Sequence, residues 1–336
     1  MHSPFSGNPT AMPLSSRYMS PAAMALWVIP LAYVLITLTL NYLAGTLTLP
    51  SAGEVRAQRD FNAALGMPIV TGYLWFNVRL LHRRTASTIV SYLIAQQRMT
   101  EFSYYRDVLT RWLQHQVIIA ASIALLVTTV YLASEGLLAL DLQIGVLLLN
   151  VTAVPFWFFI WLYLLQVTTT TRFISRRLIS SAGNGLSEIK LLKPFSDLGL
   201  SNAIHAVFSL LIVPVFWFGK DIPTIDIVLL SIFGGGLFLY LLLPVFRMQT
   251  VMKNLKVQAV NRLTARMQDI YDQAASKPRH KQDLLRSLNR CQDQIEDIQS
   301  MSVWPIDLRQ SLKIVGAFLL IPLSWACLSL AEYFTI

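Results

Sequence analysis

Charged residues are scarce in this sequence. Asp, Glu, Lys and Arg account for 13% of the 336 residues, whereas hydrophobic residues account for 54%. Soluble domains usually carry about 25% charged residues. Because an ordinary soluble core does not explain so large a deficit, long apolar segments must contact lipid. We therefore predict an all-α, polytopic membrane protein.

Cysteines are few and recognisable catalytic motifs are missing. Cys291 and Cys327 form no CxxC pair, so neither a redox motif nor a cysteine-based zinc site is indicated. The sequence contains no HExxH, no GxSxG and no Walker loop. The glycine run 234–236 lies inside an apolar segment, where small residues favour close helix packing over phosphate binding. No cofactor is expected, and an enzyme is the least favoured functional class.

Apolar segments long enough to cross a bilayer are the main feature that is present. A spanning helix needs about 20 residues. We predict a transmembrane bundle over 23–247, with spans at 23–47, 61–81, 117–140, 142–167, 198–219 and 227–246, and a terminal span within 304–336. Residues 1–22 are rich in Ser, Pro and Met and are predicted to form a disordered tail. The segment 61–81 is the weakest span, because it includes Pro68, two Asn and two Gly.

Basic residues are unevenly distributed between the spans. The connections 82–116, 168–197 and 247–309 hold most of them, and the last holds eleven. The opposite connections hold only Arg56, Arg59 and Lys220. Because basic connections remain in the cytoplasm, seven spans place the N-terminus inside and the C-terminus outside a bacterial-type cytoplasmic membrane. If 61–81 does not cross, six crossings remain and the N-terminus lies outside.

Residues 248–303 are predicted to form an antiparallel helical hairpin in the cytoplasm. Apolar residues recur there at steps of three and four, first up to Ala274 and again after the break at Pro278. The second stripe has the spacing of a coiled coil. The predicted seam consists of Leu255, Leu263, Ile270, Leu288, Ile295 and Ile298. Either the two arms bury each other, or they also bind the segment 79–116, a second copy or a cytoplasmic protein. The segment 79–116 has no Pro or Gly, so long helices are expected there too.

Proline recurs inside the predicted spans. Six of the seven contain one, at Pro30, Pro68, Pro155, Pro214, Pro244 and Pro322. A proline removes one backbone hydrogen bond and kinks a helix. These kinks can be static packing features or hinges, and the sequence leaves both open.

Polar residues inside apolar segments are the candidate functional positions, because burying them in lipid is costly. They are Asn150, Asn202, His205 and Glu135. Each also has a structural explanation. An asparagine can bridge two helices, His205 can be a hydrogen-bonded packing residue, and Glu135 lies near the outer boundary, where it can reach water.

Basic residues at the predicted inner boundary are candidates for lipid contact. They are Arg83, Arg84, Arg172, Arg176 and Arg177. Each can contribute roughly 1 kcal/mol of attraction to anionic headgroups. Because the basic residues cluster between apolar segments, lipid explains them and no nucleic-acid partner is expected.

Two functional hypotheses follow from the sequence. The first is a membrane-embedded assembly or sensing component whose hairpin docks a partner or another copy. The second is a channel or permease with a path past Asn150, Asn202 and His205. A coupled pump normally needs a carboxylate near the membrane midplane, and the predicted spans offer none there.

Overall fold

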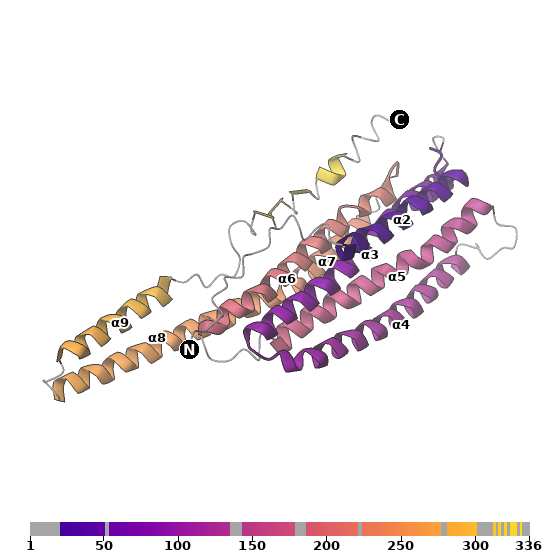
Figure 1. Ribbon diagram of the computed structural model, residues 1–336. Coiled ribbons are helices and arrows are strands. Elements are labelled where there is room, and N and C mark those ends of the chain that lie inside the picture. The colour runs from indigo at the N-terminus through magenta and orange to yellow at the C-terminus, as the bar shows by residue number, and fades with distance from the viewer. Residues whose placement is uncertain are drawn as a thin grey trace. The chain divides into compact units, whose positions relative to one another are not determined.

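The computed structural model describes residues 21–50, 54–134, 143–178, 186–220, 224–276 and 281–300, with isolated positions between 312 and 330. All regular structure in these ranges is helical, which confirms the predicted all-α class (Figure 1). The chain divides into two compact units. The first comprises Met1–His82, Ile118–Tyr163 and Val215–Lys220, and the second comprises Arg83–Val117, Leu164–Pro214 and Asp221–Ile336.

The first unit is built from α2 (Pro21–Leu43), the beginning of α3 (Val55–Ala95), the end of α4 (Phe102–Ser134) and the beginning of α5 (Ile144–Phe173). Helix α2 packs closely on α3, because a Cβ added at Gly72 would overlap the Val34 side chain. The buried Asn41 amide also donates a hydrogen bond to the Ala64 carbonyl, at 2.9 Å. Trp75 of α3 stacks on Phe159 of α5, with ring centroids 4.9 Å apart.

A short 3₁₀ helix, η3 (Val213–Trp217), completes the first unit at Val215. The apolar segment 198–219, predicted as one span, is not one continuous α-helix, since α6 (Leu186–Leu210) ends before η3. Pro214 explains the break, because proline lacks the N–H that an α-helix needs. The Asn62 amide donates to the carbonyls of Phe216, within η3, and Phe218, just after it, at 3.2 and 2.7 Å.

The second unit contains α6, α7 (Thr224–Leu241), α8 (Leu243–Ser276), α9 (Lys281–Ser300) and the remaining parts of α3, α4 and α5. Two short elements belong to it: the 3₁₀ helix η1 (Met99–Glu101) and the π-helix η2 (Ile174–Leu178), which continues α5. The expected long helices over 79–116 are present as the end of α3 and the start of α4.

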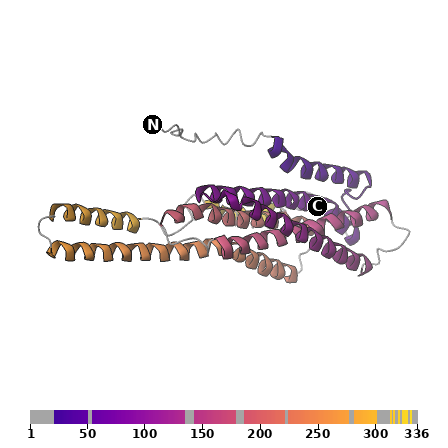
Figure 2. The same cartoon turned by 60° about the horizontal axis from the view of Figure 1, so that its bottom comes forward.

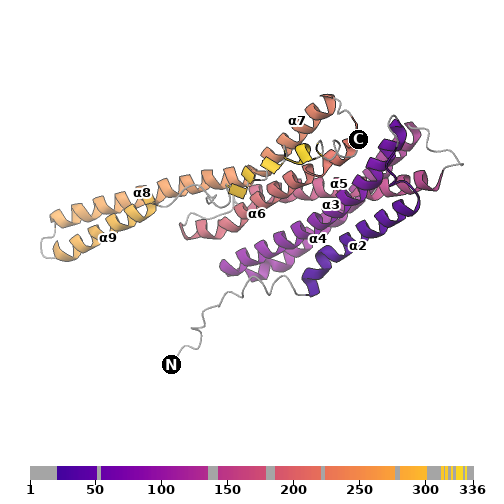
Figure 3. The same cartoon turned by 90° about the horizontal axis from the view of Figure 1, so that it is seen from above.

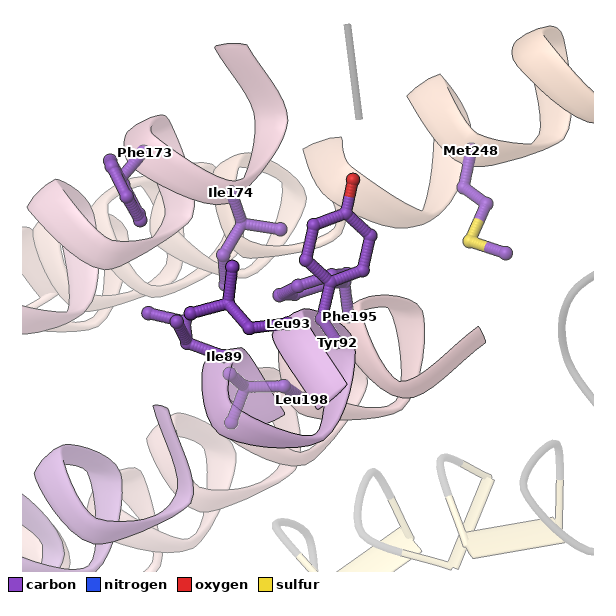
Figure 4. Packing of buried hydrophobic residues seen from close by; sticks show 8 residues of the cluster. All are labelled: Ile89, Tyr92, Leu93, Phe173, Ile174, Phe195, Leu198 and Met248. Carbon is purple, nitrogen blue, oxygen red and sulfur yellow. The ribbon is translucent and has the colours of Figure 1, made fainter. Parts of the chain in front are cut away.

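The hydrophobic core of the second unit lies at the base of α8. Its buried members are Ile89, Tyr92, Leu93, Phe173, Ile174, Phe195, Leu198 and Met248, and Figure 4 shows them together. They come from α3, from α5 with η2, from α6 and from α8. Phe102, Tyr105, Leu109 and Trp112 of α4 pack against this set. Five helices therefore meet at one apolar cluster.

Helices α8 and α9 lie side by side in both rotated views (Figure 2, Figure 3). They are antiparallel, because the Lys256 ammonium donates to the Gln299 carbonyl at 2.6 Å while residues 276 and 281 are close in sequence. Leu255, Leu288 and Ile298 are buried between the arms, and Leu263, Ile270 and Ile295 are half-buried. The two arms thus bury each other along the apolar stripes.

Five stretches of the described chain are long and apolar enough to cross a membrane. They are Leu26–Leu43, Met99–Ala133, Ile144–Arg176, Pro194–Trp217 and Thr224–Asp272. They support the assignment as a membrane protein. The segment 61–81 is not among them. Its polar residues Asn62, Thr71 and Asn77 are buried inside the first unit, so this part of α3 offers little apolar surface to lipid.

Candidate functional site

A cavity of about 230 Å³ lies among α3, α4 and α5 of the first unit. Its lining comprises Arg56, Arg59, Asp60, Ala63, Met67, Tyr131, Val146, Leu149, Asn150 and Ala153. Counted from Arg56 and from Val146, the lining residues of each helix lie at positions i, i+3, i+4 and i+7, and Met67 follows at i+11 on α3. Each set therefore occupies one helix face. The charged groups lie at the start of α3 and the apolar groups lie further along it.

Asn150 is the one polar candidate from the sequence that lies in this cavity. It is half-buried and follows the start of α5 by six residues. Asn202 and His205 belong to the second unit instead, both on α6. Glu135 lies outside the described residues. The structure therefore brings Asn150 together with Arg56 and Arg59, which the sequence places in a short connection between two predicted spans.

The charged end of the cavity is electropositive. Arg59 and Asp60 form an ion pair at 3.2 Å, with both side chains about one-third exposed (35% and 30%). Arg56 adds a second guanidinium, which is exposed. Burial, and next the neighbouring Arg59, lower the pKa of Lys220, while Asp60 acts in the opposite direction. Asp60 is thus outnumbered by cationic groups at this end of the first unit.

The helix starts strengthen this positive potential. The first helical hydrogen bond at the start of α5 runs from the Leu147 N–H to the Gln143 carbonyl, at 3.1 Å. The N–H groups that precede it carry the partial positive charge of a helix N-terminus. Arg56 and Arg59 lie within the first two turns of α3, where cations are disfavoured by the same partial charge. Tyr131 lies near the end of α4, where the partial charge of the helix dipole is negative, so this wall offsets part of the positive potential.

A second polar cluster lies on α6 in the second unit. The Arg84 guanidinium contacts the Ser201 hydroxyl and lies 3.1 Å from His205 Nε2. Asn202, beside Ser201 in sequence, is 4% exposed, and its Nδ2 has no hydrogen-bond partner within the described residues. This half-buried arginine was assigned to lipid headgroups in the sequence analysis, and it faces α6 in the structure.

The other predicted headgroup residues have simpler surroundings. Arg83, Arg172 and Arg176 are exposed, as a contact with lipid headgroups requires. Arg177 lies in η2. In the described part of the chain, no group of three or more His, Cys, Asp or Glu residues could hold a metal ion.

Sequence reasoning missed two parts of this arrangement. It did not pair Arg56, Arg59 and Asp60 with Asn150. The spacing along each helix indicates which residues share a face, but not that the two faces meet. It also missed the core at the base of α8, because Met248 entered the prediction only as the first residue of the hairpin. Comparison with known proteins adds nothing to this picture, since no family model, curated protein or solved structure matches the chain.

Proposed function

We propose that the chain is a membrane-embedded sensing or assembly component. Its α8–α9 hairpin would transmit conformational changes of the membrane helices to a bound partner. The observation that carries this proposal is the apolar core at the base of α8. There, Met248 is 1% exposed and packs in the same cluster as Ile89, Ile174 and Phe195. A movement of any of these helices must be accommodated by α8.

The connection between the core and the hairpin is stiff. Helix α8 continues without interruption from Leu243 to Ser276, so Met248 lies about 42 Å from the end of the helix at 1.5 Å per residue. The Arg247 guanidinium also donates to the Ser175 carbonyl of η2, at 3.2 Å. Packed cores shift between discrete arrangements and deform little. A small shift at the base would therefore become a larger displacement at the tip.

The outer surface of the hairpin is polar. The exposed residues of α9 include Arg286, Arg290, Asp293, Glu296 and Asp297. On α8, Val257 and Tyr271 are exposed apolar exceptions, at 52% and 56%. Since the apolar seam is already filled by the two arms, a partner would meet mainly charged groups. Such contacts are screened by salt and suit reversible docking.

The membrane arrangement belongs to the same proposal. We propose seven spans, with 61–81 crossing as an enclosed helix and the last crossing within 304–336. The Lys and Arg distribution then places the hairpin and the N-terminus in the cytoplasm and the C-terminus outside. Anionic lipid headgroups would surround Arg83, Arg172 and Arg176. The partner is a cytoplasmic protein or a second copy of the chain.

Site-specific photocrosslinking in intact cells tests the proposal. A crosslinking residue at Arg290, exposed on α9, should give one discrete adduct, either with a protein or with a second copy. The same residue at Ile118, which is 66% exposed on α4, is the control. Met248→Asp should abolish the Arg290 adduct without preventing membrane insertion, because it places a charge in the core. No adduct above the Ile118 background would overturn the proposal.

A permease or channel is the second candidate, and the cavity beside Asn150 is the observation that favours it. A path for solute must be open to both faces of the membrane, whereas a blind pocket is open to one. Asn150→Cys, in a chain with Cys291 and Cys327 replaced by alanine, can be tested with a membrane-impermeant thiol reagent applied to each face in turn. Labelling from both faces would favour transport, and labelling from only one face would exclude a continuous path at this position.

A further inference from the structure

The cavity in the first unit combines a cationic end with an apolar end. Its start is cationic, with the guanidinium groups of Arg56 and Arg59 on one face of α3. Its other end is apolar and is lined by Ala63 and Met67 of α3 and by Ala153 of α5. Guanidinium groups match the planar oxygen pairs of carboxylates and phosphates, and they hydrogen-bond to both oxygens.

Volume limits what can occupy the cavity. Pockets for drug-sized ligands measure roughly 300–1,000 Å³, whereas this cavity measures about 230 Å³. It has room for a headgroup and a short tail. A whole lipid acyl chain would not fit. The charged end requires an anion, and the apolar wall rejects a ligand that is charged along its whole length, because each desolvated charge needs its own partner.

We propose that this cavity binds a small organic anion, with its carboxylate or phosphate on Arg56 and Arg59 and a short apolar tail along Ala63, Met67 and Ala153. The Asn150 amide and the Tyr131 hydroxyl stand on the α5 and α4 walls, where they can hydrogen-bond to headgroup oxygens. Asp60 also pairs with Arg59, so its carboxylate lowers the net positive charge that a ligand meets there.

This inference would supply the chemical input for a sensor, but it rests on the cavity alone and requires no role for the hairpin. In the proposed topology the starts of α3 and α5 lie at the outer face, so the anion would enter from outside. Photocrosslinking from α9 and ligand binding in the first unit are separate measurements. Failure of either leaves the other result interpretable.

Binding of hexanoate and hexyl phosphate to the purified full-length chain is the direct test. Hexanol, with the same tail and no charge, is the matched ligand control. We expect saturable binding of at least one anion, and Arg56→Gln should weaken it roughly tenfold, the size of one charge-assisted hydrogen bond. Arg83→Gln, an exposed arginine on the same helix but outside the cavity, should change binding less than twofold.

A second measurement does not depend on the choice of ligand. Ala63→Cys, in a background without Cys291 and Cys327, places a thiol on the cavity wall. An anionic methanethiosulfonate reagent should react faster there than a cationic one. Arg56→Gln should slow the anionic reagent and speed the cationic one, each by roughly tenfold, so the ratio of the two reaction rates should fall. Hexanoate should protect this cysteine against the reagent, and hexanol should not.

Three results would overturn the inference. The first is no saturable binding of either anion, together with no preference for the anionic reagent at Ala63→Cys. The second is equal loss of binding in Arg56→Gln and Arg83→Gln, because the cavity arginine would then have no special role. The third is protection of Ala63→Cys by phosphatidylglycerol in lipid nanodiscs together with no protection by hexanoate, because the anion would then be a membrane lipid.

Discussion

Asn62→Leu should destabilise the first unit, because the Asn62 amide donates to two backbone carbonyls at the end of η3. The side chain is 1% exposed, and its Nδ2 lies 2.7 Å from the Phe218 carbonyl and 3.2 Å from the Phe216 carbonyl. Leucine branches at the same carbon and has the same number of side-chain heavy atoms, but it has no donor. The Phe216 carbonyl would lose this donor, while Phe218 would keep its 2.9 Å bond from Gln58. One buried group left unsatisfied costs about 1–3 kcal/mol.

Asn77→Leu is the matched control for this prediction. Asn77 is also buried on α3, at 2% exposure, but its amide donates to the Tyr73 carbonyl within the same helix, at 3.0 Å. The Tyr73 carbonyl lies inside α3 and keeps its backbone hydrogen bond when the side-chain donor is lost. We therefore expect the free energy of unfolding to fall by less than about 1 kcal/mol. Unfolding of both variants by a denaturing detergent, titrated into a mild one, measures the difference. Equal destabilisation would refute the role assigned to Asn62.

Two further predictions concern the membrane arrangement and the hairpin. A reporter active only in the cytoplasm should work when fused after Lys277 and fail when fused after Ile336, and activity at Ile336 would contradict the seven-span topology. Ile298→Asp should separate α8 from α9 and increase amide hydrogen exchange in both, since Ile298 is 7% exposed in the seam. Gln292→Glu, on the exposed face of α9, should leave exchange unchanged. Similar exchange in both variants would mean that the seam does not hold the arms together.

The hairpin illustrates what local sequence can predict. An apolar step of three or four residues fixes one face of a helix, and two such helices separated by a proline have few ways to bury those faces other than against each other. Leu255 and Leu288 are buried in this way. Leu263 and Ile270 are only half-buried. Periodicity therefore identified the face, but it could not say how deeply each position would be covered.

The cavity illustrates what local sequence could not predict. Arg56 and Asn150 are 94 positions apart in the chain, and nothing in either segment indicates that α3 and α5 present these residues to the same space. Their helix faces could be read from the sequence, but the choice of neighbouring helix is a tertiary property. Arg56 and Arg59, which precede the predicted span 61–81, entered the prediction only through the orientation of the chain in the membrane. Their capacity to bind an anion was therefore overlooked.

Arg83 and Arg84 show why the charge rule for topology does not assign side-chain roles. The rule counts both residues equally on one side of the membrane. Successive residues on a helix point about 100° apart, however, because a turn takes 3.6 residues. Arg83 is exposed, while Arg84 is turned toward Ser201 and His205 of α6. The direction in which a helix is rotated is fixed by its neighbours, and charge counting contains no information about it.

The same reasoning explains why the predicted span 61–81 has low hydropathy. A hydropathy window reports how well a segment tolerates lipid, and it is most reliable for helices that face lipid. On α4, Ile118, Leu126 and Val130 are 66%, 64% and 59% exposed, so that helix meets the criterion easily. On α3, Asn62 and Thr71 are buried, Asn62 donates to carbonyls at the end of η3, and α2 packs closely at Gly72, so hydrogen bonds and packing replace lipid contact along this helix. A helix enclosed by its neighbours can carry polar residues that would exclude a lipid-facing one, so low hydropathy at 61–81 is the expected consequence of enclosure and is no argument against crossing.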